Sequence, residues 1–356
     1  MLSDSKIRAA KPRAKLYKIA DERGLVMLVM PNGSKLCIRQ TVALDDGQQL
    51  AYSALVLATG TKARRFPLLD RGASNALSLR TASDAMALRQ QLASAESVVV
   101  LGGGFIGLEV AATARTLGKR VTVIEMAPRL MGRSVSAALA EHVRSVHASQ
   151  GIDIRLGAVV QSVLCDGGRV VAVHLSDEVI PCDLLLVAIG AEPDVQLAQE
   201  AGLACDNGIV VDAGMSTSDP TIFAIGDCTS FPVGAGRRLR LESIQNANDQ
   251  ARVLAARLAG QEAVYAPIPW FWSEQGGLRL QMVGLLPLQV TTYRRDGSNP
   301  GIFSLFHFEG GQLLCVESVN APMDHMVARK WIEAGRSPSP EQVVNTDLPL
   351  KTLLSQ

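Results

Sequence analysis

The stretch VVVLGGGFIGLEV, residues 98–110, decides how the rest of the sequence is interpreted. A short β-branched run ends at Gly102, further glycines follow as far as Gly107, and the next residues have helical periodicity up to Gly118. This order of strand, tight turn, helix and C-terminal glycine predicts the opening of a dinucleotide-binding βαβ unit. Glycine turns also join strands to helices in sheets that bind nothing, so the neighbouring residues must decide between the two.

The residues after the turn favour nucleotide binding. The next β-branched run ends in Glu125, about 20 residues beyond the glycines, as in the dinucleotide-binding fingerprint. Gly102 makes the tight turn, Gly104 lets the backbone approach a pyrophosphate, and Gly107 allows close packing of the helix. The helix N-terminus offers N–H groups to phosphates. A carboxylate at Glu125 would accept hydrogen bonds from ribose hydroxyls and repel a 2′-phosphate, which favours NAD(H); a solvated strand end is the alternative interpretation.

Composition limits the classes of partner. The 356 residues include 35 Lys and Arg against 34 Asp and Glu, so no overall field favours nucleic acid or an anionic membrane. No uninterrupted apolar run approaches the ~20 residues that span a bilayer. The cysteines, which are far apart and lack metal-ligand spacing, are Cys37, Cys165, Cys182, Cys205, Cys228 and Cys315. The sequence predicts a soluble cytoplasmic protein without a metal site or a nucleic-acid or membrane partner, and leaves the oligomeric state open.

Two other segments resemble each other. Residues 42–60 and residues 173–190 each contain a strand, an acidic turn, a polar return strand and an apolar strand that ends in glycine. This similarity places them at corresponding ends of two related nucleotide folds. Gly102 precedes Gly190 by 88 residues, whereas only 59 residues precede Gly60. A matching glycine turn of the first fold would lie before residue 1, which predicts that the first nucleotide fold is incomplete.

The N-terminal residues allow more than one interpretation. Residues 1–18 are basic and lack the apolar core of a secretory signal, which favours the solvated remainder of a longer domain over a targeting peptide. In an alternative interpretation of the same region, the first domain has no glycine turn at all.

Six stretches together resemble one protein family. They are LVLATG (55–60), SLRTASDA (78–85), VVVLGGGFIGLEVAA (98–112), TSDPTIFAIGDC (217–228), RLESIQNA (240–247) and PWFWSEQ (269–275). In this order they resemble the FAD-dependent pyridine-nucleotide oxidoreductases, and within them the reductases of [2Fe–2S] ferredoxins that serve oxygenases. The resemblance implies an α/β flavoprotein reductase with two Rossmann-type nucleotide folds, the first of them incomplete here, and a C-terminal α+β domain.

The same resemblance divides the chain into four segments, and prolines near the boundaries suggest linkers. The implied segments are a first, partial piece of an FAD-binding domain (1–66), an NAD-binding domain (67–193), the second piece of the FAD-binding domain (194–266) and a C-terminal reductase domain (267–356). The last segment contains FSLFHFEG and QLLCVESV around a Gly-Gly turn, the pattern of a hairpin.

The resemblance assigns FAD contacts to Thr59, Gly60, Arg80, Asp227, Ile244 and Trp270. Asp227 would bind the ribityl chain, although an Asp in this place also suits a helix N-cap. Arg80 could instead be a surface charge. Trp270 would lie beside the isoalloxazine, or belong to a hydrophobic core strand; in either case alternation puts Trp272 on its face and Phe271 on the other.

For NAD(H) the resemblance assigns Gly102, Gly104, Ile106, Gly107, Glu125 and Gly190. Gly190 would place backbone near the nicotinamide ribose. Glu109 follows the last glycine of the turn by two residues and would approach the nicotinamide. In the alternative interpretation, its charge complements the helix dipole.

No protein side chain is predicted to react chemically. Cys228 has no second thiol in CxxC or CxxxxC spacing, which favours a packing residue over half of a redox disulfide. The five histidines show no ligand spacing. Electrons would then leave the flavin for an external acceptor. The sequence predicts an NADH-dependent FAD flavoprotein that reduces a [2Fe–2S] ferredoxin; the alternatives are an NADH oxidase or diaphorase, and an inactive fragment that binds NAD(H) but not FAD.

Overall fold

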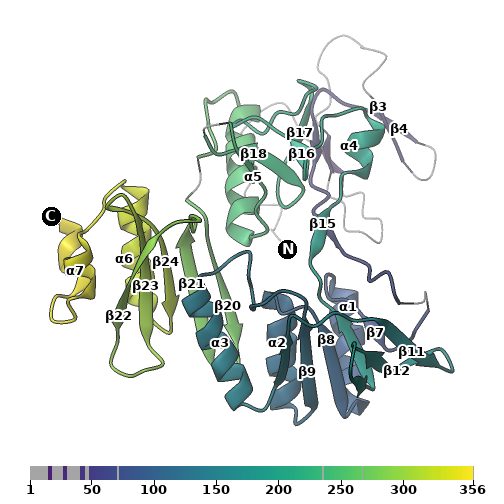
Figure 1. Ribbon diagram of the computed structural model, residues 1–356. Helices are drawn as coiled ribbons and strands as arrows, with labels where there is room; N and C mark the ends of the chain where they lie inside the picture. Colours follow the sequence, from purple (N-terminus) through teal and green to yellow (C-terminus); the bar gives the residue numbers. More distant parts are fainter. Residues whose placement is uncertain are drawn as a thin grey trace. The chain divides into compact units, whose positions relative to one another are not determined.

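The chain forms two compact units, each built from two segments of sequence (Figure 1). Unit 1 comprises Met1–Lys62 and Glu192–Pro267, and unit 2 comprises Ala63–Ala191 and Ile268–Gln356. The computed structural model describes residues 15–17, 27–29, 41–44, 48–69, 72–234, 236–266 and 268–355. The expectations for residues 1–14 and for Cys37 lie outside these described residues.

A five-stranded parallel sheet forms the centre of the nucleotide fold in unit 2. Its strands, in the order β10-β9-β8-β14-β7, are β10 (Asp153–Leu156), β9 (Arg120–Glu125), β8 (Ser97–Leu101), β14 (Leu184–Val187) and β7 (Ala76–Leu77). The helices packed on one face are α1 (Ala82–Ser94), α2 (Phe105–Thr116) and α3 (Ala137–Ser149). The other face carries an antiparallel sheet of β11 (Ser162–Asp166), β12 (Arg169–His174) and β13 (Val179–Pro181).

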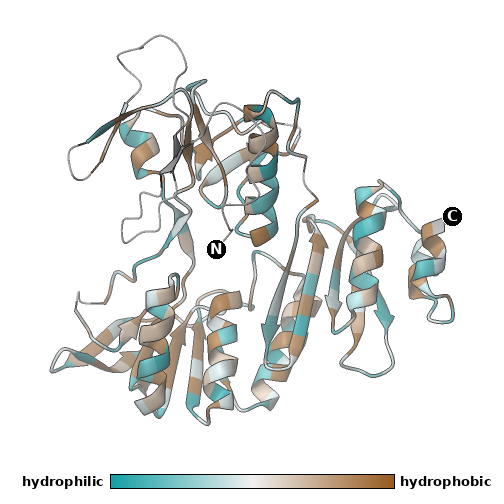
Figure 2. Ribbon diagram, turned by 180° about the vertical axis from the view of Figure 1, so that it is seen from behind, coloured by the Kyte–Doolittle hydropathy of each residue, from teal (hydrophilic) through white to brown (hydrophobic). Residues whose placement is uncertain are grey.

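Burial on both faces explains the apolar run of β8. Val98 and Val100 pack into the core beneath the helices, whereas Val99 and Leu101 pack against the small antiparallel sheet. Figure 2 shows the hydrophobic residues concentrated on the strands of the parallel sheet. Helix α1 begins where the Thr81 hydroxyl and the Asp84 carboxylate form a capping box, as the T-x-x-D pattern favours.

The C-terminal part of unit 2 is an antiparallel sheet covered by helices. In the order β20-β21-β24-β23-β22 its strands are β20 (Trp270–Gln275), β21 (Leu278–Gly284), β24 (Gln312–Val319), β23 (Phe303–Glu309) and β22 (Thr291–Asp296). Helices α6 (Pro322–Glu333) and α7 (Pro340–Val344) and the 3₁₀ helix η2 (Leu350–Ser355) share a hydrophobic cluster with one face. Residues of the other face, among them Leu280 and Phe303, join the core of α2 and α3.

Unit 1 contains a smaller sheet in the order β1-β2-β5-β17. Its strands are β1 (Lys15–Tyr17), β2 (Met27–Val29), β5 (Leu55–Leu57) and β17 (Ile222–Ala224). Further elements are the hairpin β3 (Thr41–Ala43) and β4 (Gln49–Ala51), the sheet β16 (Ile209–Val210), β18 (Thr229–Pro232) and β19 (Arg238–Leu239), and helices α4 (Gln196–Glu200) and α5 (Ile244–Leu258). The segments through which the chain passes between the units, β6 (Thr61–Ala63) and β15 (Ala191–Pro193), form a two-stranded sheet.

Several local predictions are confirmed. The strand, turn and helix around Gly102 are β8 and α2, and Gly118 has a positive φ just after the helix. The repeated segments both contain an antiparallel hairpin followed by a buried strand that pairs in parallel with a neighbour. β23 and β24 form the expected hairpin around Gly310 and Gly311.

Within the described ranges, no helix is long and apolar enough to cross a membrane.

Candidate functional site

The glycine-rich turn connects β8 to α2 in unit 2. A Cβ on Gly102 would lie 2.3 Å from the Ala188 carbonyl oxygen, and its φ of +107° also favours glycine. A Cβ on Gly107 would lie 2.1 Å from the Gly102 carbonyl oxygen, inside the contact of helix and strand. A Cβ on Gly104, in contrast, would meet no atom within 4 Å, and its φ of −83° suits any residue. Packing explains two of the glycines, and the open space at Gly104 suits a ligand close to the backbone.

The N-terminus of α2 faces this open space. Gly104 is the N-cap residue and supplies no side-chain cap. The first N–H groups of a helix have no partner within the helix and carry partial positive charge, so they attract phosphate. Ile106, in the first turn, is 45% exposed. The turn thus combines anion-binding backbone with an exposed apolar side chain.

Glu125 is a fixed part of the turn. Its Oε2 accepts a hydrogen bond from the Gly103 N–H at 2.7 Å, and its Oε1 accepts one from the Ala127 N–H at 2.7 Å. Each carboxylate oxygen has a second lone pair that can accept from a hydroxyl group. The side chain is therefore held beside the turn and does not behave as a solvated strand end.

Glu109 connects α2 to the C-terminal sheet. Its Oε1 accepts a hydrogen bond from the hydroxyl of Ser273 on β20. Phe105 and Phe271 hold the same strand against α2, with ring centroids 5.1 Å apart in an edge-to-face arrangement. Glu109 lies beyond the first turn of the helix, where the macrodipole effect falls off, so the dipole interpretation gains no support.

The opposite face of β20 carries the two tryptophans, as alternation predicted. The Trp270 and Trp272 rings stack with centroids 5.8 Å apart, and the Arg329 guanidinium lies 4.2 Å from the Trp270 centroid. Trp270 is half-buried and Trp272 is 44% exposed. Trp270 packs against the hydrophobic cluster that the sheet shares with α6, whereas Trp272 lies outside it, so both interpretations of Trp270 remain compatible with the structure.

Gly190 follows β14 in unit 2. Its φ is +99°, and its carbonyl oxygen accepts a hydrogen bond from the Arg64 N–H at 3.0 Å. Before α1, the backbone N–H of Arg80 donates to the Asp84 carboxylate at 3.0 Å. Gly190 thus follows a strand of the parallel sheet, and Arg80 precedes a helix that packs on this sheet.

Three of the candidate FAD residues of unit 1 follow strands at one edge of its sheet. β5 and β17 pair in parallel, so the residues after them, Thr59 and Gly60 on one side and Asp227 on the other, leave the sheet at the same edge. Ligands of such sheets bind outside the carboxyl ends of parallel strands. The Thr59 hydroxyl donates to the Asp194 carbonyl oxygen at 2.5 Å, and the Asp194 carboxylate pairs with Lys62 at 2.8 Å.

The structure excludes the helix-cap interpretation of Asp227. The chain continues from Asp227 into β18, a strand, and the next helix, α5, is capped by the Ser243 hydroxyl. Ile244 is the first residue of α5 and is 65% exposed. Its side chain is therefore accessible at the start of the helix.

The candidate residues are distributed over both units. Those of unit 1 are Thr59, Gly60, Asp227 and Ile244; those of unit 2 are Arg80, Glu109, Trp270 and all six NAD(H) residues.

Three of the described cysteines, Cys182, Cys228 and Cys315, are buried as packing residues are. Cys228 is fully buried in the core of unit 1, and burial raises the pKa of its thiol. Burial likewise raises the pKa of Cys182 to about 12. Thiols in this state are poor nucleophiles. In the described part of the chain, no group of His, Cys, Asp and Glu side chains could hold a metal ion.

Sequence reasoning missed the polar partners of Glu109. Ser273 and Gln275 alternate with exposed residues on β20, and both are buried. Gln275 pairs with His147 of α3. Polar residues at alternate positions of an apolar strand were a usable signal, because a buried polar face needs partners.

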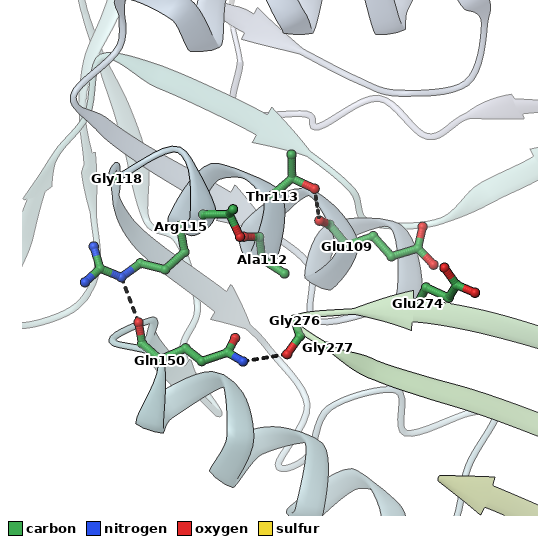
Figure 3. Close-up of a pocket in the computed structure, with 10 residues that line it drawn as sticks. Glu109, Ala112, Thr113, Arg115, Gly118, Gln150, Glu274, Gly276 and Gly277 are labelled. Atoms are coloured by element: carbon green, nitrogen blue, oxygen red, sulfur yellow. Dashed lines mark hydrogen bonds between the residues drawn. The ribbon is translucent and has the colours of Figure 1, made fainter. Parts of the chain in front are cut away.

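A groove next to Glu109 completes the surroundings of α2. Its lining comes from the α2 face around Thr113 and from the β20–β21 turn at Gly276 and Gly277. Figure 3 shows the hydrogen bonds from Arg115 to the Gln150 carbonyl oxygen and from the Gln150 side chain to the Gly276 carbonyl oxygen. The bonds of Gln150 to Arg115 and Gly276 thus join helix α2, the end of α3 and the β20–β21 turn within the protein.

Comparisons with known proteins agree with this geometry. Residues 9–251 match the family described as pyridine nucleotide-disulphide oxidoreductase, and residues 270–354 match the reductase C-terminal family. The chain is similar to rhodocoxin reductase of Rhodococcus erythropolis, with 44% identity over 89% of this chain and 75% of that protein. It is also similar to the ferredoxin–NAD(+) reductase component of the anthranilate 1,2-dioxygenase system of Burkholderia cepacia, with 42% identity over 88% of this chain and 78% of the relative.

A solved structure extends the likeness to three dimensions. The covalent putidaredoxin reductase–putidaredoxin complex superposes with a TM-score of 0.86 at 38% identity, over 89% of this chain and 78% of that one. Both nucleotide folds and the C-terminal sheet fall within the matched residues. The chain belongs to the pyridine nucleotide-disulphide oxidoreductase family, in its ferredoxin reductase group.

Proposed function

We propose that this protein is an NADH-dependent FAD flavoprotein reductase that passes electrons from NADH to a [2Fe–2S] ferredoxin of an oxygenase system. The observation that carries the proposal is the turn at Gly102–Gly107. No protein atom fills the space next to Gly104, and a hydrogen bond from the Gly103 N–H holds the Glu125 carboxylate beside the turn. In this proposal, residues 67–193 bind NAD(H), and residues 1–66 and 194–266 together bind FAD. Residues 267–356 form the C-terminal reductase domain.

The turn binds NADH through its backbone and Glu125. N–H groups at the start of α2 hold the pyrophosphate, and Gly104 allows the close approach. Glu125 accepts from the adenosine ribose, and its charge opposes a 2′-phosphate. Ile106, Glu109 and Gly190 bind the nicotinamide half.

The strand ends of unit 1 suit the sugar-like chain of FAD. Asp227 offers a carboxylate to ribityl hydroxyls, and Thr59 and Gly60 bring backbone to the same edge of the sheet. By the family resemblance, Arg80, Ile244 and Trp270 are further flavin contacts. When bound, FAD accepts a hydride and releases single electrons, so the protein supplies binding and orientation but no nucleophile.

The partner is assigned by similarity and by the chemistry of single-electron transfer. Named relatives reduce ferredoxins of dioxygenase systems, and a solved relative is bound to putidaredoxin. Our proposal goes beyond these names in two respects: the ferredoxin carries a [2Fe–2S] cluster, and the protein is cytoplasmic. An NADH oxidase or an inactive fragment is not favoured, because relatives named for electron-carrier proteins match 89% and 88% of the chain.

An anaerobic assay with the FAD-loaded protein tests the proposal. NADH oxidation should depend on added [2Fe–2S] ferredoxin and proceed to its full reduction. The comparison acceptors are a one-iron rubredoxin in the same anaerobic assay and oxygen in a separate air-saturated assay without carrier. Ferredoxin that leaves the rate at background, or oxygen that supports the same rate as ferredoxin, would overturn it.

Coenzyme preference gives a second, independent readout. Glu125→Gln removes the charge that opposes a 2′-phosphate and one of the two hydrogen bonds from backbone N–H groups, a loss that affects both coenzymes and cancels in their ratio. We expect the ratio of kcat/KM for NADH to that for NADPH to fall about fivefold, since one charged interaction of about 1 kcal/mol is lost. An unchanged ratio would contradict the assignment of Glu125.

A further inference from the structure

A chain of hydrogen bonds runs from helix α3 through strand β20 to Glu109, entirely within unit 2. His147 Nε2 pairs with Gln275 Oε1 at 2.9 Å, and Gln275 Nε2 donates to the Ser273 hydroxyl oxygen at 2.9 Å. The Ser273 hydroxyl in turn donates to Glu109 Oε1. The hydrogen bonds thus connect three parts of the sequence, around residues 109, 147 and 273, and the last bond is to the Glu109 carboxylate.

The chemistry of each group sets the direction of the chain. A hydroxyl has one proton, and a carboxylate can only accept, so Ser273 must donate to Glu109. Ser273 then accepts from the Gln275 NH₂ group, which places Gln275 Oε1 toward His147. His147 must carry its proton on Nε2 to complete the pairing. Every donor in the chain therefore faces toward Glu109.

The chain is protected from water except at its end. Ser273, Gln275 and His147 are 2%, 2% and 0% exposed, whereas Glu109 is half-buried beside the NAD(H) turn. Burial lowers the pKa of His147, against a smaller raising effect of the bond to Gln275, so the ring stays neutral near pH 7. A buried, fully directed chain holds its terminal carboxylate in one rotamer.

We propose that Ser273, supported by Gln275 and His147, is a positioning residue that orients Glu109 toward the carboxamide of the nicotinamide. This inference rests on the proposed function, because it takes the nicotinamide half of NAD(H) as the ligand of Glu109. Ser273 engages Oε1, and no described side chain or backbone group donates to Oε2. The carboxamide NH₂ is a donor, and a pre-oriented carboxylate binds it without loss of side-chain freedom.

Ligand pairs that differ only in the nicotinamide make the test selective. The oxidised, FAD-loaded protein and its Ser273→Ala variant are titrated by calorimetry with NAD⁺ and with ADP-ribose, which lacks the nicotinamide. The variant should bind NAD⁺ about tenfold more weakly, the size of one hydrogen bond to a charged group, and bind ADP-ribose unchanged. Equal weakening of both ligands, or of neither, would overturn the inference.

Three further variants exclude a general loss of structure. Ser273→Thr keeps the hydroxyl and should restore NAD⁺ binding. Ser304→Ala removes another buried hydroxyl of the same sheet, which bonds Ser318 and Asp324, and should leave both titrations unchanged. In a Glu109→Gln background, Ser273→Ala should have no further effect on NAD⁺, as expected for coupled residues. Additive losses would contradict the coupling.

The readout separates this inference from the proposed function. NAD⁺ and ADP-ribose binding require neither ferredoxin nor turnover. A protein that gives the selective loss but fails to reduce ferredoxin would retain the positioning role and lose the proposed activity. If instead the protein reduces ferredoxin and the Ser273→Ala variant binds NAD⁺ normally, the proposed activity is retained and the positioning role is lost.

Discussion

The proposed NAD(H) turn of unit 2 and the proposed FAD residues of unit 1 differ in what fixes the backbone around them. In unit 2, Gly102 and Gly107 are required by the protein's own backbone, because a Cβ on either would overlap a carbonyl oxygen. In unit 1, a Cβ on Gly226 would find its nearest neighbour at 3.8 Å, and the glycine is favoured by its φ of +83°. The proposed site of unit 2 depends on close packing at its glycines, whereas Gly226, next to the proposed FAD residue Asp227, is favoured by its turn conformation.

The difference teaches where a sequence carries information about a ligand. A tightly packed glycine turn has a recognisable pattern, because every position is constrained by distance. A site of side chains at strand ends has no such pattern. Thr59 and Asp227 stand just past apolar strands, but their assignment to FAD came from family resemblance. Perturbations of the two regions should accordingly have different consequences.

The largest effect is expected from Gly107→Ala. The new Cβ would lie 2.1 Å from the Gly102 carbonyl oxygen and 3.2 Å from Val100 Cγ1, and backbone cannot yield as a flexible side chain can. We expect a loss of about 3 kcal/mol in the free energy of unfolding, measured by denaturant titration. Gly226→Ala in unit 1 is the control for a glycine without close neighbours; an equal loss there would break the comparison.

Acid should destabilise unit 2 in particular, because it contains all five histidines of the chain. Burial, with Arg329 and Arg279 nearby, lowers the pKa of His325 from 6.5 to about 4. In the unfolded chain His325 binds a proton below about pH 6.5, and in the folded protein only near pH 4. The free energy of unfolding is therefore highest above pH 6.5 and decreases as the pH falls from 6.5 to about 4. At pH 5 the expected decrease is about 2 kcal/mol.

Hydrogen exchange by mass spectrometry locates the acid effect. Peptides of unit 2 should lose protection between pH 7 and pH 5, after correction for the intrinsic exchange rate, more than peptides of unit 1. His325→Gln should reduce the loss. Equal loss of protection in both units would contradict the prediction.

Gly104→Ala should spare the fold and weaken the ligand. No atom lies within 4 Å of the new Cβ, and the φ suits alanine, so the free energy of unfolding should change by less than about 1 kcal/mol. The methyl group would occupy the space of the pyrophosphate, and NAD⁺ affinity should fall about tenfold by calorimetry. Unaltered affinity would mean that Gly104 is not a ligand contact.

The smallest effect is expected from Asp227→Asn in unit 1. The amide keeps the size of the side chain but loses the charge, so the dissociation constant of FAD should rise about fivefold. The ratio of flavin absorbance to protein absorbance after dialysis measures it. NAD⁺ binding to the turn of unit 2 should stay the same, and a parallel loss of NAD⁺ affinity would show that the two sites are not separable.

Local signals explain which parts were predictable from sequence. β8, α2 and the hairpin of β23 and β24 depend on residues within a few positions of each other, where periodicity and glycine turns operate. The bond of Ser273 to Glu109 joins residues 164 positions apart. It depends on Phe105 and Phe271 holding β20 against α2, a tertiary contact that no local pattern encodes.

Buried ionisable pairs escaped prediction for the same reason. Glu317 on β24 accepts hydrogen bonds from the backbone and hydroxyl of Ser136 and pairs with His307 at 3.0 Å. Ser136 caps α3, so the C-terminal sheet contributes to the start of a helix 181 positions earlier. In the sequence these three residues have no common pattern.

The shared core of α2, α3 and the C-terminal sheet has a consequence for protein engineering. Leu280, Met282 and Phe303 of the sheet lie in one hydrophobic cluster with Leu108 and Leu139 of the helices. A C-terminal segment transplanted from a relative would bring one half of an interlocking surface. Chimeras that aim to change the electron acceptor should therefore exchange these helices and the sheet as a single module.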